Sequence, residues 1–347
     1  IRSEMNGYAI SILILVLMYT FYVGFNDGST AIATTVVSRA IKPTTAIIVA
    51  AMTKFILPIC VFFIGTGSVA TNIQDSLVFA ESFQNVSPEK AFAFMLSGML
   101  GAMIWAGIAF ACKIPNTISH TLLGGIIGAA IAAFGFNAIQ WKEYVLLNVV
   151  AMVLLAPLVG FVLGYAFLFI IKKFVRHAPR RMNKLLKIAQ RVNLIVLTGA
   201  FSANNSQKSL GVLLLLSTLG LWDIGDKMPF WVVLVIAIAL TLGMLFGGYR
   251  VMNTVGRKIF KIAPIHSVVS QLTTSLVSIA GTGLGISLGM GQVMTSSVIG
   301  VGSAERFNAV KWTTAGKITL GWCMTLPISI GAGYLMFMLI GKLIMGV

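Results

Sequence analysis

Two polar clusters interrupt otherwise apolar stretches of this sequence, and asparagines stand at the centre of both. The first reads Gly24-Phe25-Asn26-Asp27-Gly28-Ser29-Thr30, and the second reads Ser202-Ala203-Asn204-Asn205-Ser206-Gln207-Lys208. Amide, hydroxyl and ammonium donors, together with the free backbone N–H groups at a helix start, can hold an anion. We expect each cluster to break its helix, so that a half-helix beginning at Asp27 or Asn205 points its positive dipole end inward. The alternative is that the asparagines only cap kinked helices.

A second pair of polar segments occurs later in each half of the chain. Residues 115–121 (Pro-Asn-Thr-Ile-Ser-His-Thr) run into a glycine-rich stretch, and residues 292–295 (Gln-Val-Met-Thr) run into Ser-Ser-Val-Ile-Gly. We expect both to form hairpin-like segments. Hydroxyl donors beside the breaks and hairpins can orient an oxyanion. They belong to Ser29, Thr30, Thr34, Thr35, Thr117, Ser119, Thr121, Thr295, Ser296 and Ser297.

Four ionisable residues fall within apolar stretches: Asp27, Lys54, His120 and Lys208. A charge at the bilayer centre costs about 3 kcal/mol, so such residues normally face a cavity and serve a function. Each also has a structural explanation: Lys54 can pair with Asp27, Lys208 can extend to the membrane surface, and His120 can be a buried hydrogen-bonded histidine. The two lysines suit a small oxyanion. Three more polar side chains in mid-run can belong to the same site: Gln271, Thr273 and Thr274.

The composition is that of a membrane protein. Of the 347 residues, 58% are hydrophobic and 10% are charged. Soluble domains carry about a quarter charged residues, which excludes a soluble enzyme. A membrane-spanning helix needs about 20 apolar residues. The qualifying runs predict an all-helical polytopic membrane protein of about ten spans, some broken or hairpin-like: residues 8–38, 43–66, 91–112, 115–136, 144–171, 192–219, 230–249, 264–284, 286–303 and 313–346.

The basic residues indicate the topology of these spans. Eight of them lie in the polar linker, residues 172–191, and most others lie at the ends of apolar runs, so the net charge of +16 does not indicate nucleic-acid binding. Placing the linker in the cytoplasm puts most of the basic residues on the cytoplasmic side, where the loops of membrane proteins carry an excess of lysine and arginine. Both termini then lie outside. Residues 1–171 and 192–347 become two five-span halves of opposite topology, which we interpret as an inverted repeat.

Motifs for other chemistry are missing from the sequence. It has no Walker loop, no G-x-S-x-G, no H-E-x-x-H and no dinucleotide fingerprint. The three cysteines, Cys60, Cys112 and Cys323, have no metal-binding or disulfide spacing. We therefore expect a transport or binding function, without enzymatic activity and without a cofactor.

On these motifs the chain resembles the inorganic phosphate transporter (Pit) family over essentially its whole length. Gly24–Gly28, with Ser38-Arg39-Ala40 after it, resembles the G-[FA]-N/H-D motif, and residues 202–208 resemble its second copy. Residues 115–121 resemble P-x-S-S-S-H-T, and residues 296–302 match the corresponding stretch of the second half. Four motifs in order within an inverted repeat are a specific signal.

The resemblance implies uptake of inorganic phosphate across the cell membrane by symport with Na⁺ or H⁺, through alternation of one part of the protein against the rest. By position it assigns nine residues to the phosphate and cation sites: Asn26, Asp27, Ser119, His120, Thr121, Asn204, Asn205, Gln207 and Lys208. Their neighbours Gly28, Ser29, Thr117, Thr295, Ser296 and Ser297 complete the predicted phosphate site. Cation coupling is assigned to Asn26, Asp27, Asn204, Asn205 and Gln271, with Na⁺ at Asp27 and Asn205.

The chain departs from the family at its carboxylates. Many sodium-coupled members have Asp where this chain has Asn205, and Glu where it has Lys54 and Gln271. The second hairpin also lacks the family's P-x-S-T-T run. With Asp27 as the remaining acid, these departures favour proton coupling through Asp27, while a Na⁺ site built from carbonyl and amide oxygens stays open.

Two other functions remain open at this point. A sulfate or other oxyanion transporter can have the same fold, and a channel-like or sensing protein can have an oxyanion site without accumulating its ligand. The expected partners are phosphate, Na⁺ or H⁺ and the lipid bilayer. The sequence does not decide whether the chain forms a homodimer.

Overall fold

The computed structural model describes residues 7–65, 68–76, 78, 80–83, 86–112, 114, 116–175, 182–224, 228–247 and 259–346. Within these ranges the regular structure is helical, apart from one isolated bridge between Val78 and Ile139. Several parts of the predictions fall outside them: Pro115 of the first hairpin motif, residues 176–181 of the linker, the ends of two predicted runs at 66 and 248–249, and basic residues 2, 113, 227, 250, 257 and 258. The prediction of an all-helical membrane protein is confirmed.

Seven helical stretches in the described part of the chain are long and apolar enough to cross a bilayer. They are α1 (Gly7–Val37), α2 (Pro43–Ile64), α4 (Pro88–Ala111), the π-helix η3 (Trp141–Ala151) with α6 (Met152–Val175), α7 (Met182–Thr218), α8 (Phe230–Gly247), and α12 (Trp312–Met336) with η5 (Phe337–Gly341) and α13 (Lys342–Met345). The other three predicted runs form α5 (Ile118–Phe134), α10 (Pro264–Gly283) and α11 (Met290–Glu305). The short helix α3 (Ser68–Ser76) follows α2.

The expected helix breaks at the two asparagine clusters are wrong, because α1 and α7 are both continuous. Neither helix contains a proline, and in each cluster a serine hydroxyl is satisfied within its own helix. The Ser29 hydroxyl donates to the carbonyl of Asn26 at 2.8 Å, and the Ser206 hydroxyl donates to the carbonyl of Ala203 at 3.1 Å. Serine and asparagine are only weak helix breakers, so tertiary packing keeps these helices intact. The clusters therefore contribute side chains rather than helix ends.

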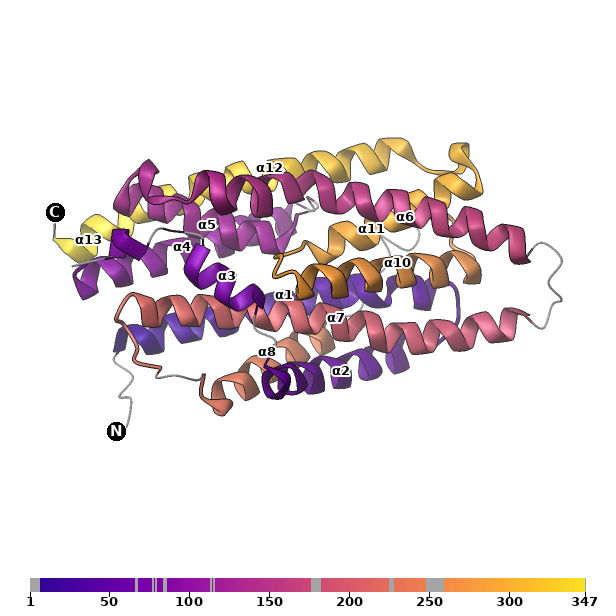
Figure 1. Ribbon diagram of the computed structural model, residues 1–347, viewed down its shortest axis with the longest axis horizontal. Helices are drawn as coiled ribbons and strands as arrows, with labels where there is room; N and C mark the ends of the chain where they lie inside the picture. The colour runs from indigo at the N-terminus through magenta and orange to yellow at the C-terminus, as the bar shows by residue number, and fades with distance from the viewer. Residues whose placement is uncertain are drawn as a thin grey trace.

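The segments expected to be hairpin-like, 115–136 and 286–303, each contain a single helix, and each of these helices pairs with the helix before it in the chain to form a helical hairpin. α4 and α5 form the first, and α10 and α11 form the second. α5 and α11 both begin inside the protein, and their first residues meet there: a Cβ placed on Gly289 would contact the side chain of Thr117. Figure 1 shows α5 and α11 ending near each other in the middle of the molecule. Two helix N-termini therefore face one interior point.

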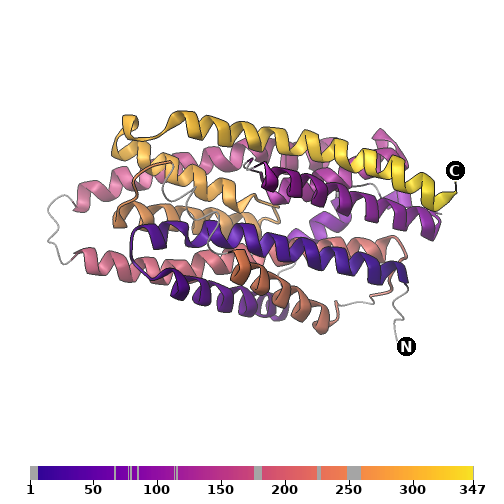
Figure 2. The ribbon, with the colours of Figure 1, turned by 180° about the vertical axis from the view of Figure 1, so that it is seen from behind.

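The helices form two groups that pack against each other. α1, α2, α7 and α8 lie on one side, and α4, α5, α6, α11 and α12 lie on the other, with α10 against α7 between them (Figures 1 and 2). The start of α1 and the end of α13 lie at one end of the molecule, and the end of α6 and the start of α7 lie at the other (Figures 1 and 2). The α5 and α11 tips lie at the boundary between the groups.

One local structure occurs twice, at opposite ends of the molecule (Figure 1). A Phe-Asn-Ala turn, 136–138 or 307–309, precedes a tryptophan that starts the next long helix. The Trp141 indole donates to the carbonyl of Phe136 at 2.9 Å, and the Trp312 indole donates to the carbonyl of Phe307 at 3.1 Å. In each copy the two ring centroids are 4.6 Å apart.

Close helix crossings are also paired. α5 packs on α12, and α11 packs on α6. A Cβ on Gly128 would collide with the backbone carbonyl of Ile330, and a Cβ on Gly300 would collide with that of Phe161. Small residues at such crossings let membrane helices approach closely enough for dispersion contacts to hold them together.

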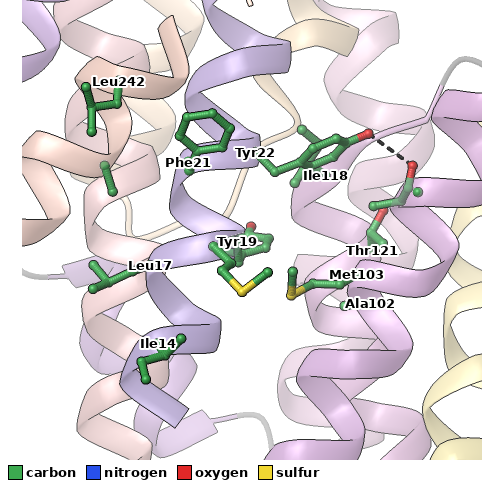
Figure 3. Close-up of a pocket in the computed structure, with 14 residues that line it drawn as sticks. Ile14, Leu17, Tyr19, Phe21, Tyr22, Ala102, Met103, Ile118, Thr121 and Leu242 are labelled. Atoms are coloured by element: carbon green, nitrogen blue, oxygen red, sulfur yellow. Dashed lines mark hydrogen bonds between the residues drawn. The ribbon is translucent and has the colours of Figure 1, made fainter. Parts of the chain in front are cut away.

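An apolar pocket of about 510 Å³ lies between α1, α4, α5 and α8 (Figure 3). Tyr19, Met103 and Ile118 line it, and its outer residues Ile14 and Met18 are exposed at the surface of the protein. The Tyr22 hydroxyl is satisfied by the carbonyl of Ala106 at 3.0 Å. The pocket offers almost no polar group and does not suit an oxyanion.

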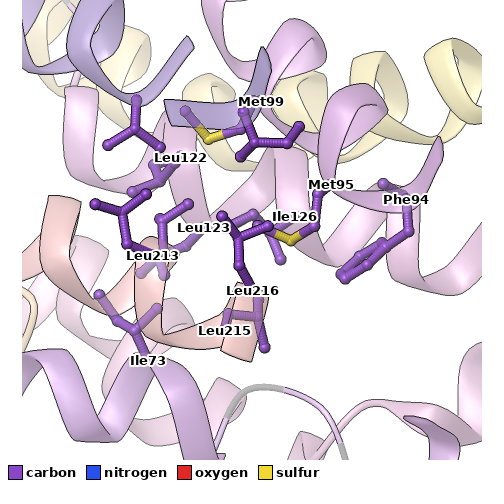
Figure 4. Packing of buried hydrophobic residues seen from close by; sticks show 14 of the residues in the cluster. Ile73, Phe94, Met95, Met99, Leu122, Leu123, Ile126, Leu213, Leu215 and Leu216 are labelled. Atoms are coloured by element: carbon purple, nitrogen blue, oxygen red, sulfur yellow. The ribbon is translucent and has the colours of Figure 1, made fainter. Parts of the chain in front are cut away.

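The largest apolar cluster fixes the first hairpin against the opposite group. Met95 of α4 and Leu122 and Leu123 of α5 pack with Leu213 and Leu216 of α7 (Figure 4). All five are almost completely buried. This packing sets the position of the α5 tip relative to α7, which carries the second asparagine cluster.

A small ionic cluster lies near the linker end of α6. Glu305, the last residue of α11, accepts hydrogen bonds from Lys172 at 3.1 Å and from His266 at 3.0 Å. Partial burial alone would raise the pKa of Glu305, but these two partners outweigh it and hold the pKa below its usual value.

Candidate functional site

Lys208 lies at the point where the two hairpin tips meet α7. Its side chain is 1% exposed, and its ammonium group makes three hydrogen bonds. It donates to the hydroxyl of Ser119 at 2.6 Å, to the amide oxygen of Asn205 at 3.1 Å and to the carbonyl of Leu288 at 2.8 Å. An ammonium has three donors, so this charge is fully hydrogen-bonded although it is buried. Lys208 does not reach the surface, and the snorkelling explanation is excluded.

Asn205 joins Lys208 to the buried acid Asp27. Its side-chain nitrogen donates to Oδ2 of Asp27 at 3.0 Å while its oxygen accepts from Lys208. Asp27 is 6% exposed, and among the described buried residues it is the one carboxylate. The two asparagine clusters, 178 positions apart in sequence, therefore form one polar centre between α1 and α7.

The tips of α5 and α11 supply further donors to this centre. Thr117, which precedes α5, makes no capping hydrogen bond with its side chain, and Gly289, which precedes α11, has no side chain to make one. The first N–H groups of a helix have no partner within it, and they carry the positive end of the helix dipole. Ser119 comes from the α5 tip and Leu288 from the segment before α11, so both tips contact Lys208. The arrangement suits a compact anion.

Several predicted site residues surround this centre without partners of their own. His120 is fully buried next to Ser119, and neither ring nitrogen has a hydrogen-bond partner within the described structure. The Thr117 hydroxyl at the α5 tip is likewise unpartnered. Buried polar groups are normally hydrogen-bonded, so such groups at a helix tip indicate a ligand or water that completes them.

Other predicted residues hold the scaffold of the site. The Asn204 side chain donates to Thr282 at 3.0 Å and to the carbonyl of Ile286 at 3.2 Å, which ties the second hairpin to α7. The Gln207 oxygen accepts from the backbone of Val69 in α3 at 3.0 Å. These asparagine and glutamine side chains position the hairpin and α3 around Lys208.

A third set lies away from Lys208. Gln271 of α10 donates to Thr35 of α1. Gly28 packs against Met244 of α8. Five of the predicted hydroxyls make bonds to backbone carbonyls: Ser29 and Thr30 to Asn26, Thr121 to Thr117, Ser296 to Val293 and Ser297 to Ser270. The buried hydroxyls of Thr34 and Thr273 have no partner in the described structure. Thr295 is buried in α11, and Asn26 is partly exposed beside Asp27.

Sequence reasoning missed two polar groups of the candidate site, the side chain of Gln292 and the carbonyl of Leu288. Gln292 of α11 is 1% exposed, and both polar atoms of its side chain lack a partner in the described structure. A lone amide two residues after the start of a buried apolar helix was the available signal. The Leu288 carbonyl could not be found in this way, because any residue type presents the same group.

Lys54 is the second buried lysine near this centre. It lies in the middle of α2 and is fully buried, and its carbonyl accepts from the Ser202 hydroxyl of α7 at 3.1 Å. Its amine has no hydrogen-bond partner among the described residues, and no salt bridge joins it to Asp27. The structural ion pair between Lys54 and Asp27, the alternative explanation for this buried lysine, is therefore not formed among the described residues.

Comparisons with known proteins identify relatives of this chain. The chain is 32% identical over 96% of its length to a protein of Bacillus subtilis named "Probable low-affinity inorganic phosphate transporter", covering 97% of that protein. It is also 32% identical to a Rhizobium meliloti protein of the same name, with 92% of each chain covered.

A solved structure described as the sodium-dependent phosphate transporter has the same fold, with a TM-score of 0.79 and 20% sequence identity. The superposition covers 97% of this chain and 99% of that one. Residues 23–333 match the sequence model of the phosphate transporter family. The chain therefore belongs to the phosphate transporter family.

Proposed function

We propose that this chain is a secondary active transporter that takes up inorganic phosphate together with a cation, H⁺ or Na⁺, by alternating access. One observation carries the proposal: the Lys208 ammonium and the N-termini of α5 and α11 converge on one buried point at the boundary of two helix groups. Family membership supports phosphate as the substrate and transport, rather than catalysis, as the activity.

The contacts of Lys208 suggest how phosphate is held. Its three acceptors are neutral groups, of Ser119, Asn205 and Leu288. Hydrogen bonds to a charged acceptor are roughly twice as strong as those between neutral groups, so a phosphate oxygen competes well for this ammonium. Phosphate then replaces the Leu288 carbonyl and also receives N–H groups from the two tips. This frees Lys208 from the second hairpin when substrate binds.

The cation side of the mechanism involves Asp27. Its carboxylate is the one buried acid described, and Asn205 holds it next to Lys208. A co-transported Na⁺ or proton reduces the negative charge that phosphate brings into the buried centre. Moving one charge against 100 mV costs about 2.3 kcal/mol, so uptake of an anion into a negative interior requires this compensation.

Alternating access requires two parts that move against each other, and transporters often build them from inverted repeats. We propose that residues 1–171 and 192–347 are such repeats, joined by a cytoplasmic linker at 172–191, with both termini outside. The matching Phe-Asn-Ala turns before α6 and α12, at opposite ends of the molecule, support this proposal. So do the paired crossings of α5 on α12 and α11 on α6.

The experiment is uptake of radiolabelled phosphate into proteoliposomes, with a Na⁺ gradient and a pH gradient applied separately. We expect saturable accumulation above the outside concentration with one of the two gradients and inhibition by excess arsenate. Inhibition by molybdate or thiosulfate but not by arsenate would instead assign the site to sulfate. Phosphate binding without accumulation under either gradient would contradict transport and indicate a sensor.

A further inference from the structure

The two buried lysines differ in whether hydrogen bonds stabilise a charge on the side chain. Lys208 donates three hydrogen bonds, so its ammonium is satisfied in the structure as it stands. Lys54 is equally buried, but its amine has no hydrogen-bond partner in the described part of the chain. A buried ionised group without a partner is so costly that such a group gives up its charge instead. The contrast leaves Lys54 as the buried lysine whose charge no described hydrogen bond stabilises, so that this amine can gain or lose a proton.

Lys54 lies close enough to the polar centre to respond to what binds there. Its carbonyl accepts from Ser202, and Asn205 follows one helical turn later on α7. Asn205 in turn holds Asp27, whose charge acts electrostatically on the Lys54 amine. The carboxylate does not satisfy that amine directly, because no salt bridge joins the two within the described residues.

Few other charged groups surround Lys54. α1 contributes Asp27, and α7 contributes Lys208, while the other basic residues of α7 lie toward its linker end. α8, the third helix packed on α2, carries no ionisable side chain. With both lysines charged and Asp27 ionised, the empty centre would hold one uncompensated positive charge. Phosphate brings one or two negative charges and removes that excess.

We propose that Lys54 gains a proton when phosphate binds and loses it when phosphate leaves, so that this lysine couples proton movement to phosphate transport. The inference rests on the proposed function. In the coupling step, the lone pair of the amine accepts a proton from the aqueous side to which the centre is open, and no other bond changes. The loaded protein carries one phosphate and, on Lys54, one extra proton in addition to any cation at Asp27, and the empty protein returns with a neutral Lys54.

Reciprocal linkage makes this measurable at equilibrium, because a proton that strengthens phosphate binding must be taken up when phosphate binds. Purified protein in weakly buffered detergent at pH 7 is mixed with inorganic phosphate, and the protons absorbed are read from a pH-sensitive dye. The comparison is with Lys54→Arg, which stays charged. Phosphate itself also releases or takes up protons when it binds. This amount is the same for both proteins, so it cancels when the proton uptake of Lys54→Arg is subtracted from that of wild type.

We expect wild-type protein to absorb about one proton per bound phosphate more than Lys54→Arg does, as reciprocal linkage requires. Lys54→Met, which stays neutral, is expected to absorb as little as the arginine variant. The matched control is Lys42→Arg, an exposed residue just before α2, which should behave as wild type. Thermal unfolding of each variant identifies any that fail to fold. Equal proton uptake by wild type and a folded Lys54→Arg overturns the inference.

Proteoliposomes provide the second readout. At zero membrane potential, wild type should accumulate about tenfold more phosphate than Lys54→Arg for each unit of pH difference, because one coupled proton contributes 1.36 kcal/mol per pH unit. Phosphate exchange at equal concentrations should persist in the arginine variant. Uptake by wild type that follows Na⁺ and ignores pH refutes the role of Lys54 but leaves phosphate transport intact. Absence of both exchange and uptake in wild type refutes the proposed function itself.

Discussion

Replacing Lys208 by methionine separates the binding role of its charge from its packing role. Methionine keeps most of the side-chain volume but removes the ammonium that donates to Ser119, Asn205 and Leu288. A hydrogen bond to a charged group contributes about 1.5 to 3 kcal/mol, so loss of one such bond to phosphate raises its Kd by about 10- to 150-fold.

The assay is isothermal titration calorimetry of inorganic phosphate in detergent. Lys317→Met is the matched control, because Lys317 is an exposed lysine on α12, far from the site in sequence. It should bind phosphate as wild type does. A folded Lys208→Met protein with an unchanged Kd would refute the reasoning, since the ammonium would then serve only to hold Leu288 and Ser119 in place.

Three further substitutions test other parts of the account. Asp27→Asn removes the one described buried carboxylate and should abolish gradient-driven phosphate uptake in proteoliposomes; near-normal uptake would contradict its role in coupling. Gly300→Ala places a methyl group against the carbonyl of Phe161 and should destabilise the protein by about 1–3 kcal/mol in thermal unfolding, whereas Gly316→Ala, in open space on α12, should not. Glu305→Gln removes the partner of Lys172 and His266 and should cost less than about 1 kcal/mol near neutral pH. Because the folded pKa of Glu305 is lowered, this contribution is present above about pH 4.3 and is lost as pH falls through the folded pKa; a difference from wild type that persists in strong acid would contradict it.

The sequence was most informative where hydrophobicity decides the structure. Each predicted apolar run coincides with a helix, because a run of about 20 apolar residues is stable in a bilayer only when its backbone bonds are closed within it. The same reasoning expected hairpin-like segments at 115–136 and 286–303, where the structure has the single helices α5 and α11. It misplaced the breaks at the asparagine clusters, because short polar side chains can satisfy themselves against the preceding helical turn and leave the helix continuous.

The partners within the site could be predicted only in part. Residue type singled out Asp27, Asn205 and Lys208, since charged and amide groups in mid-membrane need partners. Their mutual contacts depend on how α1 packs on α7, which no local pattern encodes. The bond from Lys208 to the Leu288 carbonyl and the lack of any partner for Lys54 follow from the tertiary arrangement alone.

The most direct test of the account is an experimental structure of the protein determined in saturating phosphate. We expect tetrahedral density within hydrogen-bond distance of the Lys208 ammonium and of the first N–H groups of α5 and α11, with the contact between Lys208 and the Leu288 carbonyl broken. Phosphate bound elsewhere, with Lys208 still donating to Leu288, would contradict the assignment of the substrate site.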